Sequence, residues 1–174
     1  MSVKQKILIL TNVYSGQNNF RREIIDALIE EGHDVVLSAP VRNETDKEEH
    51  VAYRIIDTPF NRHGVNPLKD LWLTLRYLKL LRKEHPDVVL TFTIKPNVYG
   101  GMASSLCHIP QLANITGLGL AVERQGWLQK VAITLYRIGL RKAHTVFFQN
   151  TSNMRFCEEN RMVSGRKVLL PGSG

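Results

Sequence analysis

TFTIKPNVYGG at residues 91–101, followed by NITGLG at residues 114–119, is the part of this chain that decides its fold. Each stretch begins as an apolar strand and ends in small, polar or glycine residues. In an open α/β sheet, ligands bind in the crevice beyond the carboxyl ends of the strands. Two strand ends with hydrogen-bonding side chains, so close in the sequence, therefore predict a binding cleft.

Strand-like and helix-like segments alternate along the rest of the chain. The segments expected to be strands are 6–11, 34–39, 53–56, 87–93, 111–115, 145–149 and 167–170. The segments expected to be helices are 20–31, 68–83, 97–106, 127–141 and 151–160, the last with Thr151 or Ser152 as its N-cap. This alternation predicts a Rossmann-like, doubly wound parallel sheet of about seven strands with helices on both faces.

Composition limits the classes of protein to consider. A chain of 174 residues fits one domain, and its formal charge of +7 indicates an anionic partner. Cys107 and Cys157 lie in no paired motif, so we expect neither a disulfide framework nor a zinc site, and free thiols suit a reducing compartment. No apolar run resembles a signal peptide or a membrane span, which favours a cytoplasmic protein.

Several nucleotide-binding and catalytic motifs are missing. The turn after the first strand holds only Gly16, and the second strand ends without a carboxylate, which argues against a nicotinamide-binding fingerprint. The chain shows no phosphate-binding Gly-Lys-Ser/Thr loop, Ser-His-Asp set or metal-holding Asp-x-Asp. The turn Tyr14-Ser15-Gly16 either presents backbone N–H groups to an anion or is a plain strand-to-helix connection.

The motifs TFTIKPNVYGG and NITGLG, with KVLLPGSG at residues 167–174, closely resemble the amino-terminal domain of bacterial family-four glycosyltransferases. The similar branch of that family builds capsule, the O-antigen of lipopolysaccharide and lipid-linked glycans. The resemblance implies one lobe of a GT-B fold and a retaining reaction. It also implies that residues 1–170 are an acceptor-binding domain and that residues 171–174 begin a linker to a carboxy-terminal, donor-binding domain that is absent here.

The same resemblance assigns the candidate site residues. Tyr14, Ser15 and Gly16 match the loop near the donor phosphate. The candidates for the acceptor and cleft side are Thr93, Lys95, Asn97, Asn114, Thr116, Gly117 and Gly119. Lys95 either pairs with an acceptor phosphate or donor carboxylate or fixes its own loop, and Asn97 either lines the cleft or caps a helix. Thr116 stands where many relatives place a histidine, which puts a histidine-based sugar contact in doubt.

Two basic helices raise the question of a membrane. Segments 68–83 and 127–142 each carry a tryptophan and several cations, and cations near an anionic leaflet favour docking. The membrane-facing candidates are Arg76, Lys79, Arg82, Lys83, Trp127 and Lys130. The apolar stripe of the 68–83 helix is expected to cover the sheet. Without a reader motif, nucleic-acid binding is not expected.

The sequence thus predicts a glycosyltransferase of the hexosyltransferase type, peripheral on the inner face of the cytoplasmic membrane. Its partners are a nucleotide-sugar donor, a lipid-linked or saccharide acceptor, and the donor-binding domain in cis. No cofactor and no metal are expected. Because most catalytic groups are assigned to the missing domain, the 174-residue chain alone should be inactive. The alternatives are a non-catalytic, membrane-docking and acceptor-presenting subunit of a split enzyme and, more weakly, a nucleotide-sugar epimerase.

Overall fold

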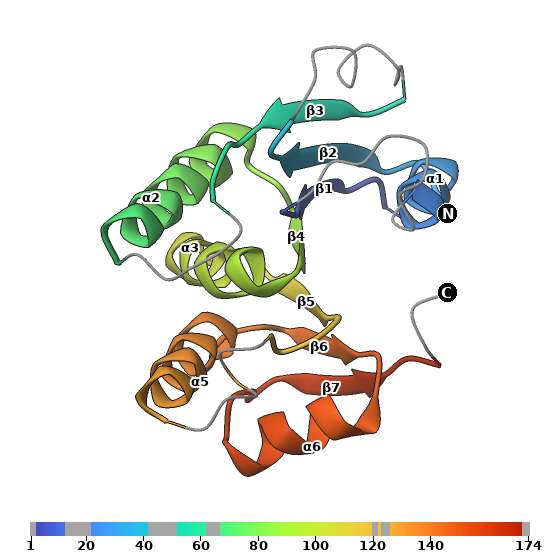
Figure 1. Cartoon of the computed structure of the whole chain (residues 1–174). Helices are drawn as coiled ribbons and strands as arrows, with labels where there is room; N and C mark the ends of the chain where they lie inside the picture. Colours follow the sequence, from blue (N-terminus) through green and yellow to red (C-terminus); the bar gives the residue numbers. More distant parts are fainter. Residues whose placement is uncertain are drawn as a thin grey trace.

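The computed structural model describes residues 3–12, 22–41, 52–61, 67–119, 122 and 126–171. These residues form one parallel sheet in the order β3-β2-β1-β4-β5-β6-β7 (Figure 1). The strands are β1 (Lys6–Leu10), β2 (Asp34–Ala39), β3 (Arg54–Asp57), β4 (Val88–Phe92), β5 (Gln111–Ile115), β6 (Thr145–Phe148) and β7 (Arg166–Leu169). The order reverses between β1 and β4, and such a switch point is where doubly wound sheets open a crevice for ligands.

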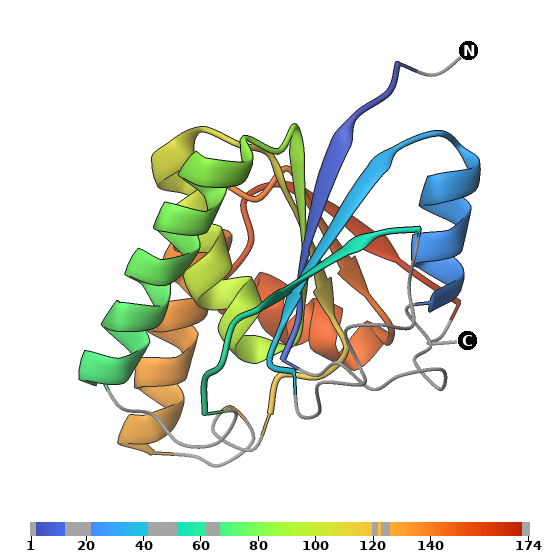
Figure 2. The ribbon, with the colours of Figure 1, turned by 90° about the horizontal axis from the view of Figure 1, so that it is seen from above.

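Helices cover both faces of the sheet. The helical segments are α1 (Arg22–Glu30), α2 (Pro67–Glu84), the π-helical turn η2 (Pro96–Gly100), α3 (Gly101–Cys107), α5 (Trp127–Leu140) and α6 (Thr151–Glu159). Figures 1 and 2 show α2, α3 and α5 on one face and α1 on the other. α6 belongs to the first face, because Cys157 lies in the same apolar cluster as Tyr136 of α5. The predicted Rossmann-like fold with about seven strands is therefore confirmed.

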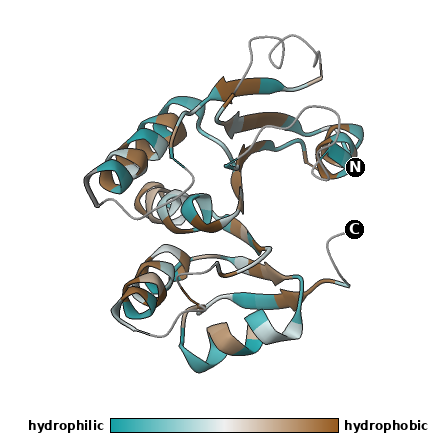
Figure 3. Ribbon diagram, in the orientation of Figure 1, coloured by the Kyte–Doolittle hydropathy of each residue, from teal (hydrophilic) through white to brown (hydrophobic). Residues whose placement is uncertain are grey.

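Two apolar clusters join the helices to the sheet. Leu8 and Leu10 of β1 point toward the α2–α3–α5 layer, whereas Ile7 and Ile9 point toward α1, as the two-residue period of a strand requires. Figure 3 shows the strands as largely hydrophobic ribbons and the helices as mixed ones. Because both faces of the central strands are covered, these strands read as continuous apolar runs rather than alternating ones.

Besides shifts of one or two residues at element ends, two features differ from the sequence-based expectations. The N-cap of α6 is Asn150, whose side chain accepts a hydrogen bond of 2.8 Å from the Asn153 backbone N–H, so the prediction of Thr151 or Ser152 was wrong. The expected 97–106 helix is divided into the π-helical η2 and the α-helical α3. Single π-helical turns are often found at functional sites, and this one follows the strand end on which the predicted cleft depends.

Close helix packing on the central strands depends on glycine. A Cβ atom at Gly101 would lie 2.2 Å from the carbonyl oxygen of Gly139 in α5, and one at Gly139 would lie 2.6 Å from Cα of Val98. A Cβ atom at Gly100 would lie 2.7 Å from Cδ1 of Leu10. Gly100 and Gly101 therefore allow this close packing. The contacts of Gly100 hold η2 against Leu10 of β1 and Thr91 of β4, near the carboxyl ends of both strands.

The face of α2 that covers the sheet is not the predicted one. The sequence-based stripe consisted of Leu68, Leu71, Trp72, Leu75, Leu78 and Leu81. In the structure, Leu73, Tyr77 and Leu81 are buried against the sheet, while Leu71, Trp72 and Leu75 are more than half exposed. The stripe assignment was therefore wrong for the first half of the helix.

Candidate functional site

The candidate site lies where β1, β4 and β5 reach the same edge of the sheet. β4 pairs with both β1 and β5, so the strand ends of the two diagnostic motifs are neighbours, as expected. Thr11 directly follows β1, Thr93 follows β4, and Thr116 follows β5. Among the residues that the structure describes, the buried Oγ1 atoms of Thr11 and Thr93 have no hydrogen-bond partner. Buried polar atoms normally have one, so two such hydroxyls at a topological switch point indicate a place for a ligand.

The backbone of Thr93 is strained. Its φ angle is 72°, in the left-handed region that a β-branched residue rarely adopts. The carbonyl of Thr93 accepts a hydrogen bond of 3.0 Å from the Asn97 backbone N–H, which holds this conformation against the first turn of η2. Strained residues of this kind cluster at binding and catalytic sites, where the surrounding structure maintains them.

A buried hydrogen-bond network supports this strand end from below. The Thr91 hydroxyl donates to Asn97 Oδ1 (2.7 Å) and accepts from Gln111 Nε2 (3.0 Å). Asn97 Nδ2 donates to the Asn114 carbonyl (2.9 Å), and Gln111 Nε2 also donates to the Asn97 carbonyl (3.0 Å). Asn97 is thus a buried link between β4, β5 and η2. Its side chain caps no helix, and a role in binding stays a prediction.

Lys95 is held by a carboxylate from a different helix. Its Nζ lies 2.7 Å from Oδ1 of Asp70 in the first turn of α2, and the two side chains are largely buried. The pKa of the Tyr99 hydroxyl is raised, first by burial and then by the charge of Asp70 and a hydrogen bond with it. The three groups tie α2 to the turn after β4. The Asp70 carboxylate also compensates the charge of Lys95.

The loop after β5 packs against the turn after β4. Gly119 has a φ of 81°, and a Cβ atom there would lie 2.4 Å from Cδ1 of Ile94, so both conformation and space favour glycine. Leu118 is buried, whereas a Cβ at Gly117 would meet no atom within 4 Å. The side chain of Gln129 in α5 donates to the Val122 carbonyl (2.7 Å) and anchors the far end of the loop. The structure therefore brings Thr93 and the residues Thr116, Gly117 and Gly119 to one edge.

The other predicted site residues are distributed as follows. Tyr14, Ser15 and Gly16 lie outside the described residues. Asn114 lies in β5, and its Oδ1 is buried without a hydrogen-bond partner in the described part of the chain. Lys79, Arg82, Lys83, Lys130 and Trp127 are exposed. The Arg76 guanidinium, in contrast, donates to the Pro59 carbonyl (2.8 Å) and lies 4.4 Å from the centre of the Trp72 ring.

The described residues contain neither a metal-binding cluster nor a membrane-spanning helix. They hold no group of three or more His, Cys, Asp or Glu side chains arranged to bind a metal ion. No helix in the ranges that the structure describes is long and apolar enough to cross a membrane.

Sequence reasoning missed two residues of this site. Thr11 comes directly after an apolar strand, but its importance depends on the reversal of strand order beside β1, which the sequence does not show. Asp70 had a visible signal, since it is the one acid among the cations at the start of a basic helix. A lone acid of this kind is a reasonable candidate for a buried ion pair.

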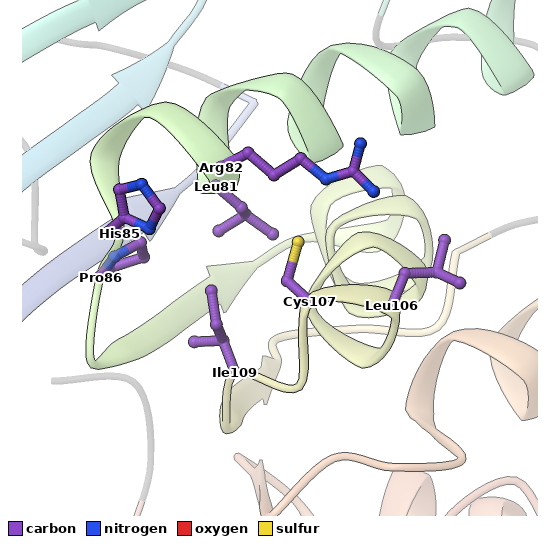
Figure 4. Close-up of a pocket in the computed structure, with 7 residues that line it drawn as sticks. All are labelled: Leu81, Arg82, His85, Pro86, Leu106, Cys107 and Ile109. Atoms are coloured by element: carbon purple, nitrogen blue, oxygen red, sulfur yellow. The ribbon is translucent and has the colours of Figure 1, made fainter.

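A shallow surface pocket of about 330 Å³ lies at the opposite edge of the sheet (Figure 4). It is lined by Leu81, Arg82, His85, Pro86, Leu106, Cys107 and Ile109, at the carboxyl ends of α2 and α3. Because helices run antiparallel to the strands they connect, this edge is the one at which the strands begin. The pocket is therefore separate from the candidate site.

A doubly wound parallel sheet with polar, partly strained strand ends at its switch point is typical of Rossmann-like lobes that bind ligands. A family model described as "Glycosyl transferase 4-like" matches residues 6–150, and the chain belongs to this family. The match includes every strand except β7 and both diagnostic motifs. The resemblance read from the sequence is confirmed at the level of the family.

Individual relatives agree with this assignment. The chain is 28% identical, over 97% of its length and 46% of the relative's, to an N,N'-diacetylbacillosaminyl-diphospho-undecaprenol alpha-1,3-N-acetylgalactosaminyltransferase of Campylobacter jejuni. Sucrose-phosphate synthase of Thermosynechococcus elongatus has a similar fold, with a TM-score of 0.67 at 14% identity over 97% of this chain and 48% of that one. Anabaena Alr3699/HepE, solved with UDP and glucose, gives 0.63 at 17% identity over 98% and 44%. The chain thus spans about half the length of these proteins.

Proposed function

We propose that this chain is the acceptor-side lobe of a retaining glycosyltransferase. The longer protein transfers a hexose from a nucleotide sugar to a lipid-linked or saccharide acceptor in cell-surface polysaccharide synthesis. The observation that carries the proposal is the pair of buried, unpartnered hydroxyls of Thr11 and Thr93, placed on either side of the switch point.

The chemistry of this edge suits a saccharide. The side chains that the structure places there are hydroxyls and an amide, namely those of Thr11, Thr93, Asn114 and Thr116, and Lys95, the cation after β4, is paired with Asp70. Neutral donors and acceptors match sugar hydroxyls, and they leave little charge to attract a phosphate. We therefore assign the acceptor sugar to this edge and the donor diphosphate to groups outside it, including the backbone of the turn around Gly16.

The relatives support the two substrates. The name of the Campylobacter relative describes transfer to a diphospho-undecaprenol-linked sugar, and Anabaena HepE was solved with UDP and glucose. Since the chain spans about half of each, the proposal assigns donor binding to a second lobe that follows residues 171–174 in cis. Closure of the two lobes excludes water and brings stabilising charges to the leaving diphosphate, without a metal or other cofactor. Without the second lobe, the 174-residue chain should be inactive.

The basic helices favour a location on the inner face of the cytoplasmic membrane. Lys79, Arg82 and Lys83 on α2 and Lys130 on α5 are exposed, and no described residue forms an ion pair with any of them. Each such cation contributes about 1 kcal/mol toward an anionic leaflet. A lipid-linked acceptor would be reached there without leaving the bilayer.

The proposal is tested by assaying the longer protein against a panel of nucleotide sugars. Acceptors should include an undecaprenyl-diphosphate-linked monosaccharide and a soluble oligosaccharide, each with and without EDTA. We expect transfer that resists EDTA and retains the anomeric configuration by NMR. Hydrolysis or epimerisation of the nucleotide sugar without transfer to any acceptor would reject the proposal, and inversion would reject the retaining assignment.

A further inference from the structure

Large apolar side chains are exposed at the amino ends of α2 and α5, two helices of the same layer. Trp72 and Trp127 are 56% and 72% exposed, and Leu71, Leu75, Leu128 and Val131 accompany them. We call these six residues the tryptophan edge. Isolated exposed apolar residues are common, but two groups of three at one edge of the sheet, each with a tryptophan, indicate an interaction surface.

The residues of the tryptophan edge are not needed to cover the sheet, because both helices bury other side chains against it. α2 already buries Leu73, Tyr77 and Leu81 against the sheet, and α5 buries Tyr136 and Leu140. Both helices pack on η2 in the same layer. α2 leads from the end of β3 to the start of β4, and α5 leads from the end of β5 to the start of β6. Both amino ends therefore lie at the carboxyl edge of the sheet, as Figure 2 shows.

The charges of the two faces differ in sign. α2 carries five cations, and its two acids, Asp70 and Glu84, are buried in ion pairs. α5 carries Lys130 and Arg137 and no acid. α6, in the same layer, adds one cation and two acids, whereas α1 on the other face carries one cation and three acids. An anionic surface would thus be attracted to the α2–α5 face and repelled by α1.

Apolar and basic residues are also separated along α2. Leu71, Trp72 and Leu75 occupy the exposed side of its first half, and Lys79, Arg82 and Lys83 occupy that of its second half. Positions 71–75 precede positions 79–83 by eight residues, or about 12 Å along the helix axis. Tryptophan prefers the membrane–water interface, and lysine and arginine prefer the phosphate and water layers above it.

We propose that the tryptophan edge inserts into the interface of an anionic lipid bilayer. The insertion turns the carboxyl edge of the sheet toward the membrane, so that the candidate acceptor site opens at the bilayer surface. Only this last consequence rests on the proposed function. A second copy of the chain fits the surface less well, because two such faces would bring their cations together.

The chain provides its own probes, because Trp72 and Trp127 are its two tryptophans. The variants W72F and W127F each leave one reporter. The test adds vesicles of phosphatidylcholine with about 30% phosphatidylglycerol, an anionic surface of the kind that attracts basic segments. We expect a blue shift of emission and quenching by brominated acyl chains in both variants. Absence of quenching in either variant overturns the proposal.

A matched pair of leucine variants separates insertion from general hydrophobicity. Leu75 belongs to the tryptophan edge, and Leu106 is similarly exposed at the opposite end of the layer. L75D should lower vesicle partitioning about tenfold in co-sedimentation, which corresponds to about 1.4 kcal/mol, while L106D should leave it unchanged. Equal effects of the two variants, or self-association abolished by L75D without vesicle binding, would overturn the proposal.

Membrane insertion and sugar transfer can be tested independently of each other. Vesicle binding through the tryptophan edge by a protein that transfers no sugar would leave this inference intact and reject the proposed function. Transfer by a longer protein whose tryptophans stay unquenched would do the reverse.

Discussion

Asp70 and Lys95 form an ion pair, 2.7 Å from Oδ1 to Nζ, in which the two side chains are 5% and 13% exposed. Asp70 belongs to the first turn of α2, and Lys95 immediately precedes η2. The pair thus fixes the start of one helix to the strained turn after β4. Loss of one partner of a buried pair leaves the other charge uncompensated, so the two residues should behave as a unit.

The first prediction concerns stability. D70N and K95M should each lower the free energy of unfolding by about 3 kcal/mol, and the double variant should lose clearly less than the sum of the two. Urea denaturation of the four proteins measures this coupling. The exposed i,i+4 pair Arg22–Asp26 is the control, where D26N should change stability by less than about 0.5 kcal/mol. Additive losses at Asp70 and Lys95 would contradict the prediction.

The same set of single and double variants separates the two roles considered for Lys95. If Lys95 only positions its turn, sugar transfer by the longer protein should recover in the double variant relative to K95M. If it contacts a phosphate or carboxylate of a substrate, transfer should stay low in both.

The second prediction is that valine at Thr11 or Thr93 lowers activity without lowering stability. Valine has nearly the shape of threonine without the hydroxyl, and neither hydroxyl has a partner among the described residues. T11V and T93V should therefore keep the free energy of unfolding or raise it by up to about 1 kcal/mol. In the longer protein, kcat/KM should fall about tenfold if the hydroxyls bind the acceptor.

Thr91 is the matched control for these valine variants. Its hydroxyl lies in the same part of β4 but is engaged with Asn97 and Gln111. T91V should lower the free energy of unfolding by about 1–3 kcal/mol, because it leaves buried polar groups without a partner. Unchanged kcat/KM in both T11V and T93V would remove the two hydroxyls from the candidate site.

The sequence predicts the elements of this fold well. All seven strands were predicted, and each of the five segments expected to be helical contains a helix. β-branched runs bounded by proline, glycine and polar residues are strong signals for strands, and βαβ connections restrict the topology. Gly32 follows α1 with a φ of 89°, the left-handed conformation in which glycine commonly ends a helix. The resemblance carried by two short motifs then led to the correct family.

The buried face of α2, the N-cap of α6 and the partner of Lys95 were harder to predict from the sequence. α2 is apolar around most of its circumference, so periodicity could not decide whether Leu73 and Tyr77 or Leu71 and Leu75 face the sheet. Asn150 competed with Thr151 and Ser152 for the N-cap, and only the backbone conformation decides among such residues. The partner of Lys95 lies 25 residues away on another helix, a contact that no local pattern contains.

The third prediction contrasts two glycines of the motifs. G101A should lower the free energy of unfolding by about 1–3 kcal/mol, since its Cβ would meet the Gly139 carbonyl and the Gln111 side chain. G117A should be neutral or slightly stabilising, because the space around it is open and alanine restricts the unfolded chain. Thermal unfolding of the two variants measures the difference. Equal losses would mean that the close approach of η2 and α5 is not what requires Gly101.

The fourth prediction concerns pH and Glu84, at the carboxyl end of α2. Hydrogen bonds from Arg54 and Lys6 and the charges of both lower the pKa of Glu84 and outweigh the opposing effect of burial. A carboxyl whose pKa is lower in the folded than in the unfolded protein stabilises the fold above the unfolded value of about 4.3, and this stability is lost as pH falls through the folded pKa.

E84Q should lower the free energy of unfolding by about 1–3 kcal/mol at pH 7 and flatten its decline below about pH 5. Urea titrations of both proteins across this range provide the measurement, and E158Q, whose pair with Lys167 is more exposed, is the control. Parallel pH profiles for E84Q and the unaltered chain would show that Glu84 does not couple folding to protonation, and the acid sensitivity of the fold would then have to arise at other carboxylates.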